Sequence, residues 1–221
     1  MNGLTLAIDA STYTGTVALI RDGAVLAERS AAMRGEHEER LMPAVSDVLR
    51  DAGVAVRSLD AVACGAGPGS FTSLRIAASI AKGLATALGV PLLVAPSPLL
   101  IVAGAVPALA PGRYIAVLDA MRGDQFALDV AVEVDGGLVA DGKPWLAPSD
   151  AVAARARERG ATLVGPVQPG ERVPHARGFA SLLRQHIAVA VDLVSWEPDY
   201  GRKAEAQVKW ERAHGRPLEA R

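Results

Sequence analysis

The sequence predicts an α/β protein of two domains, and three observations support that prediction. In the first half of the chain, short apolar runs of strand character alternate with longer runs in which apolar residues recur at helical spacing. A glycine-rich corner at residues 64–70 joins one such strand to a long helix. A later segment, residues 117–127, repeats the pattern of residues 7–17. At 221 residues, half of them hydrophobic, the chain can bury one large core or two smaller ones.

The N-terminal part of the chain predicts three antiparallel strands and then a helix. Asp22-Gly23 is a strong two-residue hairpin signal between the second and third strands. The apolar period then becomes helical, and a glycine follows where that helix must stop. In order, the expected elements are strands at residues 4–8, 16–21 and 24–31 and a helix at residues 37–52.

The next elements extend this meander by parallel crossovers. We expect a strand at residues 60–64, a helix at 71–88, a strand at 91–95 and a helical run at 98–106. The resulting order β-β-β-α-β-α-β-α is the topology of a ribonuclease-H-like domain, the unit of actin, hexokinase and Hsp70. Residues 107–112 mark a junction, so we expect a first domain at residues 1–106.

The second half predicts a reduced copy of the same unit, residues 107–221. Asp9 and Asp119 each end an apolar strand, and each is followed by alanine, a polar turn containing glycine and a further apolar strand. A duplicated strand-turn-strand unit would leave this pattern. We expect strands near residues 113–118 and 125–134, a helix at 148–159, a strand at 161–164, a helix at 179–190 and a charged, partly helical tail from residue 200.

The helix at residues 71–88 is apolar over most of its circumference. One stripe comprises Phe71, Leu74, Ala78, Ala81, Ala85 and Leu88, and a second comprises Ile76, Ile80, Leu84 and Ala87. A helix on a sheet needs one apolar face, so the other must be covered by more of the same chain or by another protein. Its small residues would let a second helix approach closely, which favours a partner, but burial inside the domain stays open.

Composition sets the limits on function. The net charge is −1, so nothing steers the whole molecule toward nucleic acid or an anionic membrane. Cys64 is the one cysteine, which excludes an internal disulfide and indicates an inert buried thiol. The N-terminus shows no signal-peptide pattern, and no apolar stretch is long enough to span a bilayer. We expect a cytoplasmic protein without a membrane partner.

Two loops resemble the phosphate loops of actin-like ATPases. Asp9, Ser11 and Thr12 follow the first strand, where hydroxyls and backbone N–H groups could bind phosphate and a carboxylate could hold hydrated magnesium. An Asp-Ser-Thr turn is also an ordinary strand ending, and we favour that interpretation. The matching loop at Asp119 carries the bulky Met121 where glycine would be needed. We therefore expect a vestigial nucleotide loop and no cofactor, with residual ATP and magnesium binding left open.

Searches for other chemistry are negative. The glycine corner lacks the Lys-Ser/Thr pair of a P-loop and the spacing of a dinucleotide fold. The four histidines are scattered, with no pair at i, i+4 spacing and no cysteine cluster, so we expect no metal site. No G-x-S-x-G elbow is present. We expect no catalytic residues.

Several motifs together resemble one family. They are Ala-Ile-Asp-Ala-Ser-Thr at residues 7–12, Gly-Pro-Gly-Ser-Phe-Thr at 67–72 with Leu-Arg-Ile at 74–76, Leu-Asp-Ala at 118–120 and Pro-Asp-Tyr at 198–200. The chain is similar over nearly its whole length to the TsaB (YeaZ) family, bacterial proteins needed to make threonylcarbamoyladenosine beside the anticodon of tRNA. This resemblance implies a two-domain actin-like fold and a non-catalytic subunit.

The resemblance also implies partners and an interface. Family members pair with the catalytic paralogue TsaD and with the ATPase TsaE, meet tRNA through that complex, and form homodimers when alone. The TsaD contact is built from the two helices of the first domain. The corresponding interface residues here are His37, Leu41, Val45, Pro68, Phe71, Leu74, Arg75, Ala78 and Lys82. The alternative is an independent enzyme of actin-like fold, either an ATP-dependent kinase or a metallopeptidase.

Overall fold

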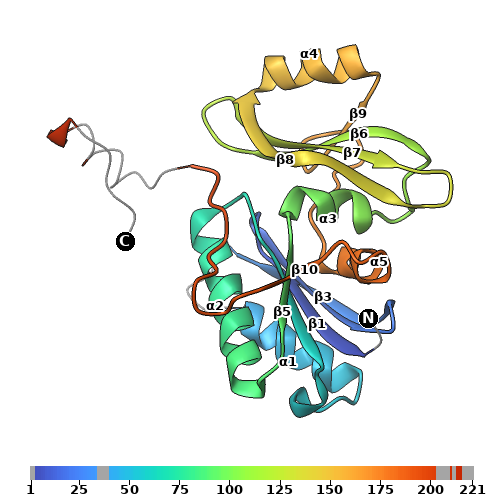
Figure 1. The fold of residues 1–221 in the computed structure, drawn as a ribbon, viewed down its shortest axis with the longest axis vertical. Coiled ribbons are helices and arrows are strands. Elements are labelled where there is room, and N and C mark those ends of the chain that lie inside the picture. The colour runs from blue at the N-terminus through green and yellow to red at the C-terminus, as the bar shows by residue number, and fades with distance from the viewer. Residues whose placement is uncertain (1–2, 34–39, 203–209, 211–212, 216–221) are drawn as a thin grey trace.

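The computed structural model describes residues 3–33, 40–202, 210 and 213–215. It contains two β-sheets with helices outside and between them. Figure 1 shows the order of the layers: α1 and α2, the first sheet, α3 and α5, the second sheet, and α4. This layering gives each sheet two covered faces, which explains why the strands at the centre of both sheets are almost entirely buried.

The first sheet has the strand order β10-β5-β4-β1-β2-β3. Its first three strands form an antiparallel meander, and β4 and β5 extend it in parallel beside β1. The turn Asp22-Gly23 has positive φ at both residues, as the predicted two-residue hairpin requires. The strands are β1 (Leu4–Asp9), β2 (Thr14–Arg21), β3 (Ala24–Ala32), β4 (Ala61–Gly65), β5 (Leu92–Ala95) and β10 (Val189–Val191).

Two helices cover one face of this sheet. The helix α1 (Leu41–Asp51) buries Leu41, Val45 and Val48 in a core shared with β1, β2 and β4. The helix α2 (Phe71–Leu88) begins at the glycine corner and ends at Gly89, which has positive φ. A short 3-10 turn, η1 (Val56–Ser58), leads from α1 to β4. Both predicted helices are therefore confirmed within the described residues; residues 34–39 lie outside them.

The second sheet repeats the beginning of the first. Its order is β8-β7-β6-β9, in which β8, β7 and β6 are antiparallel and β9 is parallel to β6. The first sheet has the same arrangement in β3-β2-β1-β4, so the predicted duplication of a ribonuclease-H-like unit is confirmed. The elements are β6 (Gly112–Asp119), β7 (Asp124–Val132), β8 (Leu138–Pro148), α4 (Ser149–Arg159) and β9 (Thr162–Val164).

A single apolar core joins the two sheets. It contains Leu99, Leu100 and Ile101 of α3 (Ser97–Ala103) and Phe179 of α5 (Phe179–Arg184), all at most 1% exposed. These helices, with the 3-10 turn η2 (Ala176–Gly178), lie between the inner faces of the two sheets. The two halves are consequently packed as one body along this layer.

The structure differs from the prediction at two elements. The strand β8 was not predicted; it is an edge strand that contains Gly142 and Pro144, two residues that weaken strand patterns. The helix expected at residues 179–190 ends at Arg184, and residues 189–191 instead pair with β5 as an antiparallel edge strand. The predicted division between residues 106 and 107 stays a prediction, although β10 shows that part of the second half completes the first sheet.

Candidate functional site

The strongest polar cluster lies around Asp9 at the end of β1. The Asp9 side chain is fully buried, and its Oδ1 accepts hydrogen bonds from the Ser11 N–H (3.0 Å) and the Ser11 hydroxyl (2.8 Å). Its Oδ2 accepts a hydrogen bond from the Ser97 hydroxyl (2.6 Å), at the start of α3. Both carboxylate oxygens are thus bonded within the chain, in a place that water does not reach.

This environment shifts two pKa values upward. Burial raises the pKa of Asp9, because removing a carboxylate from water disfavours its charge, and the hydrogen bonds from Ser97 and Ser11 only partly oppose this. Burial also raises the pKa of the Cys64 thiol on neighbouring β4, with the Asp9 charge as a smaller cause. Cys64 is therefore an unreactive thiol, as predicted from its apolar strand.

The glycine corner packs directly against this cluster. A side chain at Gly65 would collide with the Asp9 carboxylate, and one at Gly69 would collide with the Ser11 carbonyl. The Ser70 N–H donates to that same carbonyl (2.7 Å), and the Gly67 N–H donates to the Ser97 hydroxyl (3.0 Å). The corner is thus built by close backbone contact with the Asp9 turn.

The second loop has the same turn at its start but a different environment. Asp119 accepts a hydrogen bond from the Met121 N–H (2.8 Å), as Asp9 does from Ser11, yet Asp119 is exposed. Met121 and Arg122 have positive φ, an uncommon conformation for residues with side chains. Thr12, the remaining residue of the predicted vestigial loop, is half-buried and bonds to Thr14 through its hydroxyl.

The predicted interface residues divide into covered and exposed groups. Leu41, Val45, Pro68, Leu74 and Ala78 are buried within the chain itself. Phe71 is 43% exposed, Arg75 is exposed beside it with its guanidinium 5.4 Å from the Phe71 ring centre, and Lys82 is half-buried. His37 lies outside the described residues. The outward surface of α2 therefore combines the exposed Phe71 and Arg75 with small and polar neighbours. The second apolar stripe is half-buried at Ile76, Ile80 and Leu84 and exposed at Ala87.

Residues 196–200, at the start of the predicted tail and just before it, cover part of α2. Trp196 accepts a hydrogen bond at its carbonyl from the Lys82 ammonium (2.9 Å), and the Tyr200 ring lies 4.6 Å from that of Phe71. Together with α2 this segment lines a groove of about 340 Å³. Two sequence signals pointed to this segment: the Pro-Asp-Tyr motif at residues 198–200, and the aromatic side chains of Trp196 and Tyr200, since aromatic side chains in an otherwise irregular stretch commonly pack on a neighbour.

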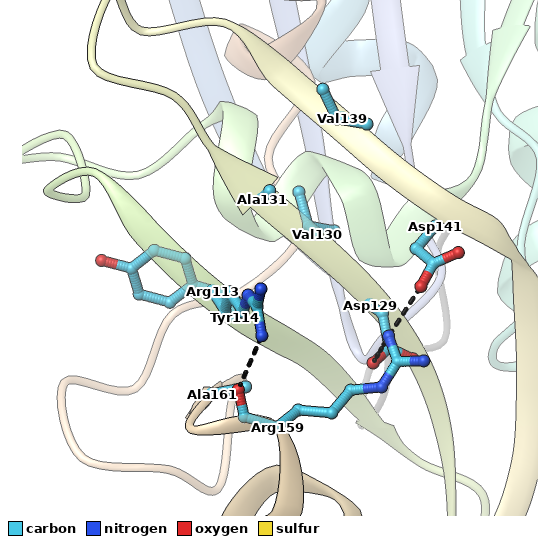
Figure 2. A pocket seen from close by; sticks show the side chains of 9 residues that line it. All are labelled: Arg113, Tyr114, Asp129, Val130, Ala131, Val139, Asp141, Arg159 and Ala161. Carbon is cyan, nitrogen blue, oxygen red and sulfur yellow. Dashed lines mark hydrogen bonds and ion pairs between the residues drawn. The ribbon is translucent and has the colours of Figure 1, made fainter.

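A second cavity, of about 380 Å³, lies on the outer face of the second sheet beside the end of α4 (Figure 2). Asp129, which is buried, pairs with Arg155 and Arg159, and Arg159 also pairs with the exposed Asp141. The remaining cation, Arg113, donates to the Arg159 carbonyl (3.4 Å). The lining of the cavity carries two cations, Arg113 and Arg159, and two anions, Asp129 and Asp141, so the formal charges of the lining balance.

Within residues 3–33, 40–202, 210 and 213–215, no group of three His, Cys, Asp or Glu side chains could hold a metal ion. No helix there combines the length and the apolar character that crossing a bilayer requires.

The paired meanders, the shared helical layer and the two equivalent aspartates define an actin-like protein of two ribonuclease-H-like units. Comparison with solved structures agrees. A Pseudomonas aeruginosa structure described as an uncharacterized protein with similarity to peptidase YEAZ superposes with a TM-score of 0.73 at 29% identity, covering 91% of this chain and all of the other. A second, "YeaZ from Pseudomonas aeruginosa", gives 0.71 at 28% identity and covers 90% and 100%.

Sequence comparison identifies the family. The "tRNA threonylcarbamoyladenosine biosynthesis protein TsaB" of Bacillus subtilis is 30% identical over 93% of this chain and 96% of its own length. The Escherichia coli protein of the same name is 37% identical over 55% of this chain and 52% of its own. The family model "TsaD: tRNA N6-adenosine threonylcarbamoyltransferase" matches residues 25–134. The chain belongs to the TsaB family.

Proposed function

We propose that this chain acts in the biosynthesis of threonylcarbamoyladenosine in tRNA, as a cytoplasmic subunit that contributes no catalytic residue. The relationship to the Bacillus subtilis protein extends over almost the full length of both chains, and that relative is named for this pathway. The buried polar groups around Asp9 are engaged in holding the corner of α2.

The burial of Asp9 is the observation that supports a subunit without catalytic residues. An ATPase of this fold would need the carboxylate at the end of β1 to face hydrated magnesium. Here both oxygens accept hydrogen bonds from Ser11 or Ser97, and the side chain has no exposed surface. This supports a scaffold over the rival interpretation, an ATP-dependent kinase or metallopeptidase acting alone.

The second part of the proposal concerns assembly. We infer that the outward surface of α2 docks on a TsaD-type catalytic subunit, with a TsaE-type ATPase and tRNA joining the complex, and that the same surface forms a homodimer when the chain is alone. An exposed phenylalanine beside an arginine is the kind of anchor that carries interface energy. Leu74 and Ala78 lie beneath this surface and shape it from below.

The assembly is tested by mixing the purified chain with a TsaD-type protein and measuring the mass of the complex by light scattering. We expect a heteromer for the wild type and at least a tenfold weaker one for Phe71→Glu, since an acidic group would replace the aromatic anchor. Val134→Glu is the matched control: it makes the same kind of change at a 90% exposed residue in the turn between β7 and β8. Equal affinity of Phe71→Glu and wild type would contradict the proposed surface.

The non-catalytic role is tested separately by titrating the isolated chain with ATP and magnesium in a calorimeter. We expect no turnover by the chain alone. Turnover that Asp9→Asn abolishes would instead establish the independent enzyme, because that variant keeps the shape of the side chain and removes its charge.

A further inference from the structure

The strap, residues 196–202, links three parts of the molecule that are distant in sequence. It has no regular secondary structure, and it begins along the outer side of α2 (Figure 1). There the Lys82 ammonium donates to the Trp196 carbonyl, and the Tyr200 ring contacts Phe71. Pro198 between them is buried. The first attachment of the strap is therefore to the surface of α2.

The second attachment is to the glycine corner. The Asp199 N–H donates to the Ala66 carbonyl (2.8 Å), and the Asp199 carbonyl lies so close to Gly67 that a side chain there would collide with it. The Asp199 carboxylate accepts a hydrogen bond from the Gly201 N–H (2.7 Å), which turns the chain away from α2. The strap thus sits on the same corner that packs against the Asp9 turn.

The third attachment is to the second sheet. Gly201 has positive φ and lies between Pro68 of the corner and Phe126 of β7, where a side chain would collide with both. Arg202 forms an ion pair with Asp124 at the start of β7 and donates to the Met121 carbonyl (3.5 Å). The strap therefore spans from the first unit to the loop that follows Asp119.

We propose that the strap is a releasable clasp that couples the outer surface of α2 to the contact between the two ribonuclease-H-like units. While it is seated, Gly201 and Arg202 hold the glycine corner against β7. If Phe71 is drawn away from Tyr200, the strap loosens and the units can move at the contact between the glycine corner and β7, while the helical layer of α3 and α5 still joins them. This inference is independent of the proposed role in tRNA modification, because it concerns only contacts within the chain.

The attachments are suited to release rather than to permanent locking. They are separate point contacts: hydrogen bonds from Lys82 to the Trp196 carbonyl, from the Asp199 N–H to Ala66 and from Arg202 to Met121, one ring pair, and one ion pair whose side chains are each about 30% exposed. The buried Pro198 and the close packing of Gly201 add apolar contact. The Arg202 Nε is buried and has no hydrogen-bond partner in the described part of the chain, which weakens the seated state. Segments with few buried contacts open at a lower free energy than the core.

Hydrogen exchange tests whether the fit of Gly201 between Pro68 and Phe126 holds the strap in place. Gly201→Ala introduces a methyl group between Phe126 and Pro68, and we expect at least tenfold faster exchange of the Asp199 amide. Gly53→Ala is the matched control, because Gly53 also has positive φ but no atom within 4 Å of an added methyl group. Arg202→Gln is a milder second variant that removes the ion pair without adding volume. An unchanged Asp199 amide in both Gly201→Ala and Arg202→Gln would overturn the clasp.

Coupling is tested by the distance between spin labels on the two units, at Thr86→Cys on α2 and Glu158→Cys on α4. Both sites are exposed, whereas Cys64 is buried and will not be labelled. We expect one narrow distance distribution in the labelled parent and in its Gly53→Ala variant, and a broader one in Gly201→Ala and in Phe71→Ala. Broadening in Gly201→Ala alone would show that the α2 contact is not coupled, and a narrow distribution in all variants would show that the strap does not hold the units.

Discussion

Asp9 and Asp119 show that residues at equivalent positions can have different physical roles. Both accept a hydrogen bond from the N–H two residues later, and this turn was predictable from the sequence. The difference arises from Ser97, which lies 88 residues from Asp9 in the chain and reaches its carboxylate through the packing of α3. No local pattern contains that contact, so burial of one aspartate and exposure of the other could not be predicted.

The raised pKa of Asp9 gives a testable pH dependence. In the unfolded chain the carboxyl group ionises near its ordinary value of 3.8, whereas in the folded chain it holds its proton to higher pH. Its contribution to stability is therefore complete below 3.8 and is lost as pH rises through the folded-state pKa. Denaturant unfolding should show that Asp9→Asn gains stability relative to wild type as pH rises from about 4 to 7.

Deleting the side chain should have a different effect. We expect Asp9→Ala to lower the free energy of unfolding by roughly 2–4 kcal/mol at neutral pH, because it leaves the hydroxyls of Ser11 and Ser97 without their acceptor. The same unfolding experiment measures this. A loss smaller than that from an exposed control such as Asp150→Ala would show that the cluster does not hold the corner.

His175 should produce the opposite pH dependence. It is 7% exposed and accepts a hydrogen bond from the Arg177 N–H. Burial, and secondarily the charge of Arg177, lowers its pKa from 6.5 to about 4. The stability it supplies is complete above 6.5 and falls as pH drops from 6.5 toward 4, by about 2 kcal/mol. His175→Asn keeps an acceptor but cannot titrate, so its unfolding free energy should fall less over that interval.

At the scale of elements, the sequence predicts helices and turns most accurately where one buried face sets the spacing of the apolar residues or a short motif sets the turn. The buried face of α1 and the hairpin at Asp22-Gly23 follow from local periodicity and turn chemistry. The misplaced elements are edge strands, whose partners lie on one side only. Residues 188–191 show no alternation of polar and apolar residues, so the sequence does not indicate a strand there. Residues 189–191 form β10 because the edge of β5 is available for pairing.

Two glycine variants should separate the corner from the helix it starts. Gly65→Ala places a methyl group against the Asp9 carboxylate inside the core, and we expect a loss of at least about 3 kcal/mol or failure to fold. Gly83→Ala lies within α2 with no atom within 4 Å of the added methyl group, and should raise stability by about 0.5–1 kcal/mol. Thermal unfolding followed by circular dichroism measures both. Equal effects of the two variants would contradict the close packing of the corner.

At the scale of the molecule, the duplication was visible in the sequence but the connection between the copies was not. The strand order of the second sheet matches that of the first as far as β9, as the repeated Asp-Ala pattern predicted. The helical layer between the sheets draws residues from both halves, and the Ala176 N–H donates to the buried Thr16 hydroxyl (3.0 Å) across them. Contacts of this kind are set by tertiary packing and leave no periodic signal.

This shared core predicts how the chain unfolds. The whole protein should lose structure in one cooperative transition, with circular dichroism and tryptophan fluorescence coincident, because Trp145 and Trp196 report on different halves. A fragment of residues 1–106 lacks β10 and Phe179, and should bind hydrophobic dyes and aggregate. Two separate transitions, or a fragment that is monomeric and cooperatively folded, would show that the halves are independent.

The position of β10 also has a consequence during synthesis of the protein. The ribosome releases β5 long before residues 189–191, so the nascent chain carries an open sheet edge while residues 96–188 are made. That edge presents unpaired backbone N–H and C=O groups on an apolar strand and can recruit a strand from a neighbouring nascent chain. Slowing elongation after residue 106 should therefore lower the yield of native protein, and a chaperone that shields exposed strands should restore it.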